Sequence, residues 1–369
     1  MTRRAAAGAL LLLAVAAPVE AQHLGSSSVT AGVQSLSYRF GPHFGVRSLS
    51  QWAIPGAVVL ARGRWLADLG ASLASTTLTR QDGSALTVTG LTDTQLRAAR
   101  VFGEDALVAT LAVNLPTGPA RLTAPEYAVL AAASSSFLGF PVSAYGSGVS
   151  VTAGGAAATS AGAWNLGLAA SLRYNGEFTP FEDADGDFSY QAGIEGRVRG
   201  GVDRLVGPAR VSLGLTYSTF SNDEFSSGAG SSGIYRPGTR FILEGSYATT
   251  IRTTTVLIYA WDFLRLAGDS AGTDAANREN VFAGGLRLGI PLSRSVVWEP
   301  GAEGRLSFPE EGRGALGSAV SALRIRVSRR LSAIPELRLV IGRLEEPPPS
   351  GVGHQITGFG FSVLFRESF

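Results

Sequence analysis

The sequence predicts an all-β protein: a transmembrane, antiparallel, up-and-down β-barrel of about 16 strands, with a short helix in one external loop. Three observations lead to this prediction. Segments of about 10–15 residues that alternate between apolar and small or polar residues recur along the chain. An export signal begins the chain, and no later stretch is apolar and long enough to cross a membrane as a helix. The chain ends on an aromatic, strand-like segment.

The N-terminal segment has the pattern of a signal peptide. Arg3 and Arg4 precede an apolar run that ends at Ala17, and Val19-Glu20-Ala21 places small residues at the two positions that a signal peptidase recognises. The apolar run is too short for a spanning helix of about 20 residues. We therefore expect residues 1–21 to be a signal peptide and residues 22–369 to form one outer-membrane β-barrel domain.

The composition narrows the function classes. Charged residues make up 16% of the chain, all 31 basic residues are arginine, and cysteine is absent. The absence of cysteine excludes disulfides, thiolate metal sites and cysteine nucleophiles. The formal net charge of +2 does not indicate a nucleic-acid partner.

Alternating apolar and polar positions define sixteen candidate strands. In one of them, Trp164, Leu166, Leu168, Ala170, Leu172 and Tyr174 alternate with small and polar residues. The candidates are residues 29–40, 50–61, 64–77, 92–102, 105–115, 148–159, 163–176, 188–200, 209–220, 239–251, 253–266, 279–291, 295–307, 315–328, 335–345 and 355–369. Fourteen strands would result if residues 22–50 folded into the lumen instead.

The connections between these candidates alternate in length. Short links, such as Ala161 to Gly162, Arg252 and Ser332 to Ile334, alternate with longer polar ones, such as Ser221 to Gly238 and Ala267 to Arg278. The link from Gly201 to Pro208 is intermediate. Bacterial barrels show this asymmetry, with short periplasmic turns and long external loops.

The last strand carries one aromatic face. Phe359, Phe361, Val363, Phe365 and Phe369 share one parity and are predicted to face lipid. The segment resembles the C-terminal assembly signal of bacterial outer-membrane proteins, with Glu367 as a departure from the usual apolar residue. The resemblance implies the outer-membrane assembly machinery and outer-membrane lipid as partners.

The longest link, Pro116 to Gly146, is predicted to contain a short helix. Thr123-Ala-Pro-Glu126 has the pattern of a capping box with proline in the first turn. The alanine-rich stretch from Tyr127 to Ala133 follows. Two hypotheses remain open for this helix: it enters or covers the external mouth, or it lies passively on the rim.

Charged side chains fall on the parity opposite to the lipid-facing residues. Charge facing lipid at the midplane costs about 2–4 kcal/mol for arginine, so these residues are expected to line the lumen. They are Arg173, Glu195, Arg197, Arg199, Arg210, Glu244, Arg287, Glu299, Glu303, Arg305, Arg324 and Arg326. Their mixed signs favour a network of paired charges over a single-sign ion filter. Arg100 falls on the lipid parity, which indicates a place near an interface.

The sequence gives little support for catalysis or a cofactor. The three histidines, His23, His43 and His354, are far apart and none lies at metal-ligand spacing. Asp183, Asp185 and Asp187 resemble the start of a calcium-binding loop. The closing glutamate of such a loop is absent, so they are a weak metal candidate beside the alternative of a solvated acidic loop. We expect no enzyme activity and no cofactor.

Two stretches resemble a known group of outer-membrane proteins. Gly90-Leu-Thr-Asp-Thr-Gln-Leu-Arg97, followed by Val113-Asn-Leu-Pro-Thr-Gly118, is similar to a pattern in the long-chain fatty-acid transporter and aromatic-hydrocarbon channel group, including transporters associated with phenol meta-pathway degradation. The resemblance implies a passive channel for small hydrophobic or amphipathic molecules. It identifies no ligand-contacting residue. A general diffusion porin and a structural or adhesive barrel with a closed lumen are the alternatives.

Overall fold

A computed structural model describes residues 26–103, 106–119, 121–183, 186–227, 232–270, 273–276, 278–308, 313–345 and 351–369. The predicted signal peptide at residues 1–21 lies outside the described residues. No helix in the described part of the chain has the length and apolarity needed to span a membrane.

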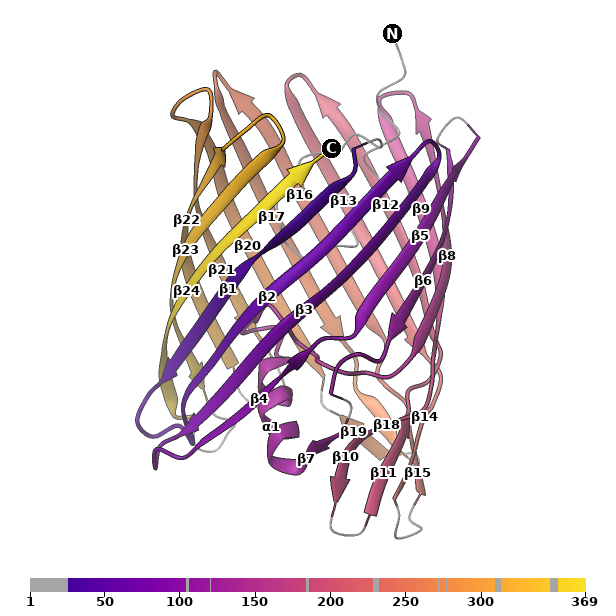
Figure 1. Cartoon of the computed structure of the whole chain (residues 1–369), viewed down its shortest axis with the longest axis vertical. Helices are drawn as coiled ribbons and strands as arrows, with labels where there is room; N and C mark the ends of the chain where they lie inside the picture. Colours follow the sequence, from indigo (N-terminus) through magenta and orange to yellow (C-terminus); the bar gives the residue numbers. More distant parts are fainter. Residues whose placement is uncertain are drawn as a thin grey trace.

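The wall is a closed antiparallel β-barrel (Figure 1). Its strands are β1 (Ser28–Phe40), β2 (Val46–Arg62), β3 (Trp65–Arg80), β4 (Ala85–Leu91), β5 (Thr94–Phe102), β6 (Leu107–Leu115), β8 (Ser150–Ala161), β9 (Trp164–Asn175), β12 (Glu195–Val206), β13 (Ala209–Phe220), β16 (Arg240–Ile251), β17 (Thr254–Arg265), β20 (Glu279–Pro291), β21 (Val296–Ser307), β22 (Arg313–Arg326), β23 (Leu331–Glu345) and β24 (Gly353–Ser368). β1 pairs with β24 from Ser28↔Ser368 to Phe40↔Ile356, and this ladder closes the barrel.

The barrel has sixteen wall positions. β4 and β5 occupy one of these positions in succession, because both pair with β3: β4 with Leu73 to Thr79 and β5 with Trp65 to Gly70. The preferred count of sixteen is therefore confirmed. The alternative in which residues 22–50 fold into the lumen is wrong, since β1 pairs on both sides, with β2 and with β24.

The two ends of the barrel differ. One end carries two-residue turns at Gly63, Gly162, Gly207 and Arg252, each with a positive φ at the first turn residue. The start of β1 and the end of β24 lie at this end (Figure 1), which short turns mark as periplasmic. At the opposite end, strands extend beyond the wall as a second sheet of β7 (Leu122–Thr123), β10 (Phe178–Asp183), β11 (Gly186–Gln191), β14 (Asp223–Ser227) and β15 (Ser232–Tyr235). The pair β18 (Gly268–Ser270) and β19 (Thr273–Ala276) lies beside that sheet.

Several sequence-based boundaries are wrong. β3 extends to Arg80, and β4 lies in a segment predicted as a link. The predicted strand 188–200 is two strands, because the chain leaves the wall at Gly193, whose N–H donates to Asp223 Oδ1 at 2.7 Å. The intermediate link from Gly201 is strand as far as Val206, where a tight turn begins. The turn predicted at Ser332 to Ile334 lies earlier, because β23 begins at Leu331.

Proline inside three wall strands explains the last of these errors. Proline cannot donate a ladder hydrogen bond and normally ends a strand or sits at an edge or irregularity. In the structure Pro55, Pro300 and Pro335 each stay in a strand, and each lies at a gap in the pairing with one neighbouring strand, while the register is the same on both sides of the gap. The interruptions lie between β1 and β2, β20 and β21, and β22 and β23 respectively. The wall therefore accommodates proline locally without losing the strand.

The outer surface of the barrel is apolar. Leu168 is 60% exposed, Ile341 70% and Phe359 52%, and each belongs to an outward-facing row of a wall strand. Phe361, Phe365 and Phe369 are exposed on the same row as Phe359. Such a continuous apolar surface would aggregate in water. A closed barrel with this surface places the protein in the bacterial outer membrane.

Replacing Arg252 by glycine is predicted to stabilise the barrel by about 1 kcal/mol. Arg252 has a φ of 56° at the first position of a two-residue turn, where type II′ geometry favours glycine and an L-residue in the left-handed region costs about 1–2 kcal/mol. Urea unfolding in lipid vesicles, followed by tryptophan fluorescence, measures the change. Gly207→Ala, at the equivalent turn position, is the control and should destabilise. An unchanged or lower urea midpoint for Arg252→Gly would contradict the strain argument.

Candidate functional site: a luminal plug beside a charged wall

The candidate site is the segment from Leu122 to Ser147, which we call the plug. It begins with β7 and α1 (Ala124–Ala133) and continues as irregular chain. The predicted capping box is present: the Glu126 carboxylate accepts the Thr123 N–H at 2.8 Å. α1 lies at the external end next to β4 (Figure 1).

The plug packs into the mouth with its apolar side chains. Val129, Ala133, Phe137, Leu138 and Phe140 are buried in one cluster with inward-facing residues of the wall. The wall members of this cluster are Leu36, Tyr38, Leu49, Leu78, Val88, Val281, Leu316, Val340 and Ile356, from β1 to β4 and from β20 to β24. Of the two hypotheses for this helix, the structure favours the one in which it enters or covers the external mouth.

Polar contacts fix the plug at several points. The side chain of Gln51, 1% exposed, clamps one plug residue: its Oε1 accepts the Val142 N–H at 2.8 Å and its Nε2 donates to the Val142 carbonyl at 2.7 Å. Gln51 Nε2 also donates to Thr76 Oγ1, which shares a further hydrogen bond of 2.9 Å with Tyr145 Oη. Paired polar groups in a buried network rigidify the packing around them.

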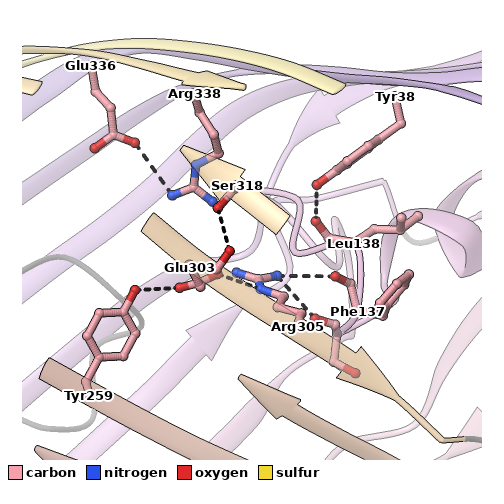
Figure 2. Close-up of polar contacts among 10 residues, drawn as sticks. Tyr38, Phe137, Leu138, Tyr259, Glu303, Arg305, Ser318, Glu336 and Arg338 are labelled. Carbon is pink, nitrogen blue, oxygen red and sulfur yellow. Dashed lines mark hydrogen bonds and ion pairs between the residues drawn. The ribbon is translucent and has the colours of Figure 1, made fainter. Parts of the chain in front are cut away.

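A second set of contacts comes from side chains of β1, β17 and β21 (Figure 2). Tyr38 Oη donates to the Leu138 carbonyl at 2.6 Å. Arg305 Nη1 reaches the carbonyls of Ser136 and Phe137 at 3.4 Å, and its Nε donates to Glu303 Oε1 at 2.7 Å. The other oxygen of Glu303 accepts from Tyr259 Oη at 2.6 Å.

Glycine at two positions allows close approach at this wall. A Cβ at Gly139, which has a φ of 65°, would come within 2.0 Å of Arg305 Nη1, and a Cβ at Gly314 would come within 2.6 Å of the Phe137 ring. These two positions let the plug chain and its phenylalanine approach the wall.

The root of the plug is tied to the break between β4 and β5. Asp93 sits in this break, and its backbone N–H donates to the Tyr145 carbonyl at 2.7 Å. Its carboxylate accepts the N–H groups of Ser147 at 2.7 Å and Gly118 at 3.2 Å. The two stretches that carry the family resemblance, around Asp93 and Gly118, therefore meet at this root. Gly118 allows the approach, since a Cβ there would lie 2.2 Å from the Tyr145 carbonyl oxygen.

Charged residues form ion pairs along the inner wall. The structure pairs Arg199 with Glu244 at 2.5 Å, Arg287 with Glu336 at 3.2 Å, Arg324 with Glu299 at 2.6 Å and Arg197 with Glu195 at 2.7 Å. Arg305 pairs with Glu303, and Arg210 with Asp203 at 3.1 Å. Arg173 Nε donates to Ser150 Oγ instead, and Arg326 is exposed at the periplasmic end of β22. We call these paired residues the charged ladder. That they line a transport path stays a prediction.

The sequence missed the residues that hold the plug. These residues are Tyr38, Gln51, Asp93 and Tyr145. The hydrogen bonds Tyr38–Leu138, Gln51–Val142 and Asp93–Tyr145 join residues that are 52 to 100 positions apart in the sequence. One signal was available for Asp93, which lies inside the first resemblance motif. No sequence signal distinguishes Gln51 from other inward glutamines, such as Gln34.

The calcium candidate stays a prediction. Asp185 lies outside the described residues, as do the side chains of Asp183 and Asp187. The backbone of Asp183 and Asp187 belongs to the β10–β11 hairpin, paired as Asp183↔Gly186 and Glu182↔Asp187. The described residues contain no group of three metal-ligating side chains.

The fold and the apolar surface together define the class of protein: an outer-membrane β-barrel. No family model matches the chain, and no curated protein matches it. Among solved structures, the P. putida toluene transporter TodX has a TM-score of 0.45 at 9% identity, covering 93% of this chain and 90% of that one. OmpT of Vibrio cholerae has 0.40 at 9%, covering 94% and 99%. CdiB from Acinetobacter baumannii has 0.48 at 11%, covering 93% and 61%. At these scores and identities the likenesses carry no argument about function.

Replacing Gln51 by leucine is predicted to loosen the plug. The change leaves the buried N–H and C=O of Val142 without their partner, at about 1–3 kcal/mol for each unsatisfied group. We expect proteinase K to cleave the folded barrel between residues 137 and 145 at least about tenfold faster. Gln34→Leu, on the same inner face of the neighbouring strand β1, is the matched control. Equal cleavage rates in the two variants would contradict the clamp.

Proposed function

We propose that the protein is a passive outer-membrane channel for small hydrophobic or amphipathic molecules. One observation supports this proposal above the others: the inside of the barrel has both an apolar surface and a charged surface. The plug and the wall strands that it contacts form an apolar layer, and the charged ladder follows other parts of the inner wall. An amphipathic solute can contact both surfaces as it passes.

The apolar layer favours apolar cargo. Side chains of the plug and wall are separated from water there, and a solute that moves the plug aside must replace those contacts. An apolar molecule replaces them at little cost, whereas a sugar would leave its hydroxyl groups without hydrogen bonds in the same layer. The layer therefore discriminates by polarity.

The charged ladder favours passage without charge selection. Its arginines and glutamates alternate in sign and neutralise one another, unlike the single-sign rings of ion filters. Diffusion along such a wall needs no cofactor and no energy input.

The site of the two resemblance motifs is consistent with this proposal. Asp93 and Gly118 join the plug to the break between β4 and β5, so both motifs contribute to holding the plug. On this basis we propose that the chain functions like the long-chain fatty-acid transporter and aromatic-hydrocarbon channel group.

A general diffusion porin is the second candidate. The side chain of Arg197 is 39% exposed, so water reaches part of the charged ladder. If a continuous water path passes the plug on that side, small hydrophilic solutes would cross as readily as apolar ones.

Uptake into liposomes tests the proposal. We expect vesicles that contain the protein to take up a hydrophobic aromatic dye at least about tenfold faster than a sugar of similar size. The dye can enter the apolar layer without leaving hydroxyl groups unpaired, whereas the sugar cannot. Equal rates would support the general porin instead. No uptake of either solute would support a barrel with a closed lumen, whose external loops serve a structural or adhesive role.

Locking the plug is predicted to slow dye uptake. The chain has no cysteine, so a Gln51→Cys, Val142→Cys pair, bridged by a short linker that forms a disulfide with each thiol, ties the plug to β2. We expect dye uptake to fall strongly and to recover when the linker is reduced. The control is a Ser75→Cys, Thr89→Cys pair, which joins two wall residues that face each other across β3 and β4. Unchanged uptake in the locked plug would mean that solutes pass without moving it.

A further inference from the structure

Three arginines lie on the outer surface at the periplasmic end, each opposite a tryptophan. Arg62 on β2 and Arg100 on β5 are both register partners of Trp65, the first residue of β3. Arg204 on β12 is the register partner of Trp164, the first residue of β9. The same pairing thus occurs on two separate parts of the wall.

The alternation of the strands places these residues toward lipid. Trp65 is 54% exposed and Trp164 41%. Arg100 shares the parity of the exposed Leu96 and Phe102, and the neighbouring inward pair is Arg97 with Asp68. Arg204 shares the parity of Val198 and Val206, both exposed. An arginine on this face is costly at the membrane midplane and nearly free near an interface, so this level marks the periplasmic boundary of the hydrocarbon.

The guanidinium groups stack on aromatic rings. The Cζ of Arg100 lies 5.1 Å from the ring centroid of Trp65 and 5.0 Å from that of Phe102. The Cζ of Arg204 lies 5.2 Å from the ring centroid of Trp164. Stacking orients a guanidinium and leaves its N–H edge free to bind an anion.

In the described part of the chain, these arginines have no carboxylate partner. The inward arginines of the charged ladder are paired with Asp or Glu, whereas Arg62, Arg100 and Arg204 form no such ion pair. The buried Nε of Arg204 has no hydrogen-bond acceptor at all. Lipid headgroups surround the barrel at this level, and their phosphate groups can serve as the anionic partners of these arginines.

We propose that these residues form two headgroup sites for anionic phospholipids of the periplasmic leaflet. One site consists of Arg62, Trp65, Arg100 and Phe102, and the other of Trp164 and Arg204. The phosphate binds the arginine N–H groups, and the aromatic rings pack against the glycerol region of the lipid. This inference is independent of what the channel transports.

Native mass spectrometry of the intact mature barrel tests the proposal. The protein is released from vesicles of phosphatidylcholine and phosphatidylglycerol, and the retained lipids are counted. We expect each Arg→Gln change at residues 62, 100 and 204 to lower the retention of phosphatidylglycerol about fivefold, with phosphatidylcholine unchanged. Raising the salt concentration should weaken retention by the wild type.

Matched variants make the result decisive. Arg39→Gln, Arg47→Gln and Arg80→Gln remove three arginines from the opposite, external end of β1, β2 and β3, and should leave retention unchanged. Arg100→Lys should keep part of it, because the charge remains and the planar stack is lost. A heat-modifiable gel shift confirms that each variant is folded. Phosphatidylglycerol retention that does not fall in the triple variant, or that falls equally in the control triple, would overturn the proposal.

Discussion

The structure depends on one constraint: inside a bilayer, every backbone N–H and C=O must find its partner within the protein. The β1–β24 ladder meets this constraint by joining the first wall strand to the last. The same constraint explains how the wall accommodates proline. Pairing with one neighbouring strand is interrupted at Pro55, Pro300 and Pro335, while pairing with the other neighbouring strand continues. Closure turns the apolar rows outward and leaves the charged rows facing a wide interior.

The side chains of the wall do not fill this interior, and the plug occupies part of the remaining space. A barrel of sixteen strands is wide enough to leave space that side chains of the wall alone do not fill. The plug brings its own backbone groups into this space, and those groups would be costly if unpaired. Gln51, Tyr38 and Arg305 supply their partners from the wall. Asp93 does the same at the root, at the one wall position where two short strands replace a long one.

Much of the wall could be predicted from the sequence because a β-barrel repeats one physical rule. Apolar residues face lipid at every second position, so the alternating pattern predicts the location of most strands. Phe359, Phe361 and Phe365 lie on the outward face of β24, as predicted. Local turn residues predicted the wrong strand boundaries where contacts between residues distant in the sequence determine those boundaries. The break between β11 and β12 contains Gly193, whose N–H donates to the Asp223 carboxylate. β23 continues through Pro335 because the ladder with β24 holds it. The plug contacts join residues as far apart as Tyr38 and Leu138, and no local pattern encodes such pairs.

The central claim is that the plug is packed stably inside the mouth of the barrel. Amide hydrogen exchange of the protein in lipid vesicles measures this most directly, residue by residue. The amides of Gly139 and Val142, which donate to Ser135 O and Gln51 Oε1, should exchange at rates close to those of the neighbouring wall strand β2. Exchange of these amides as fast as that of the exposed turn residue Gly63 would show that the plug is not held in the lumen and would contradict the account.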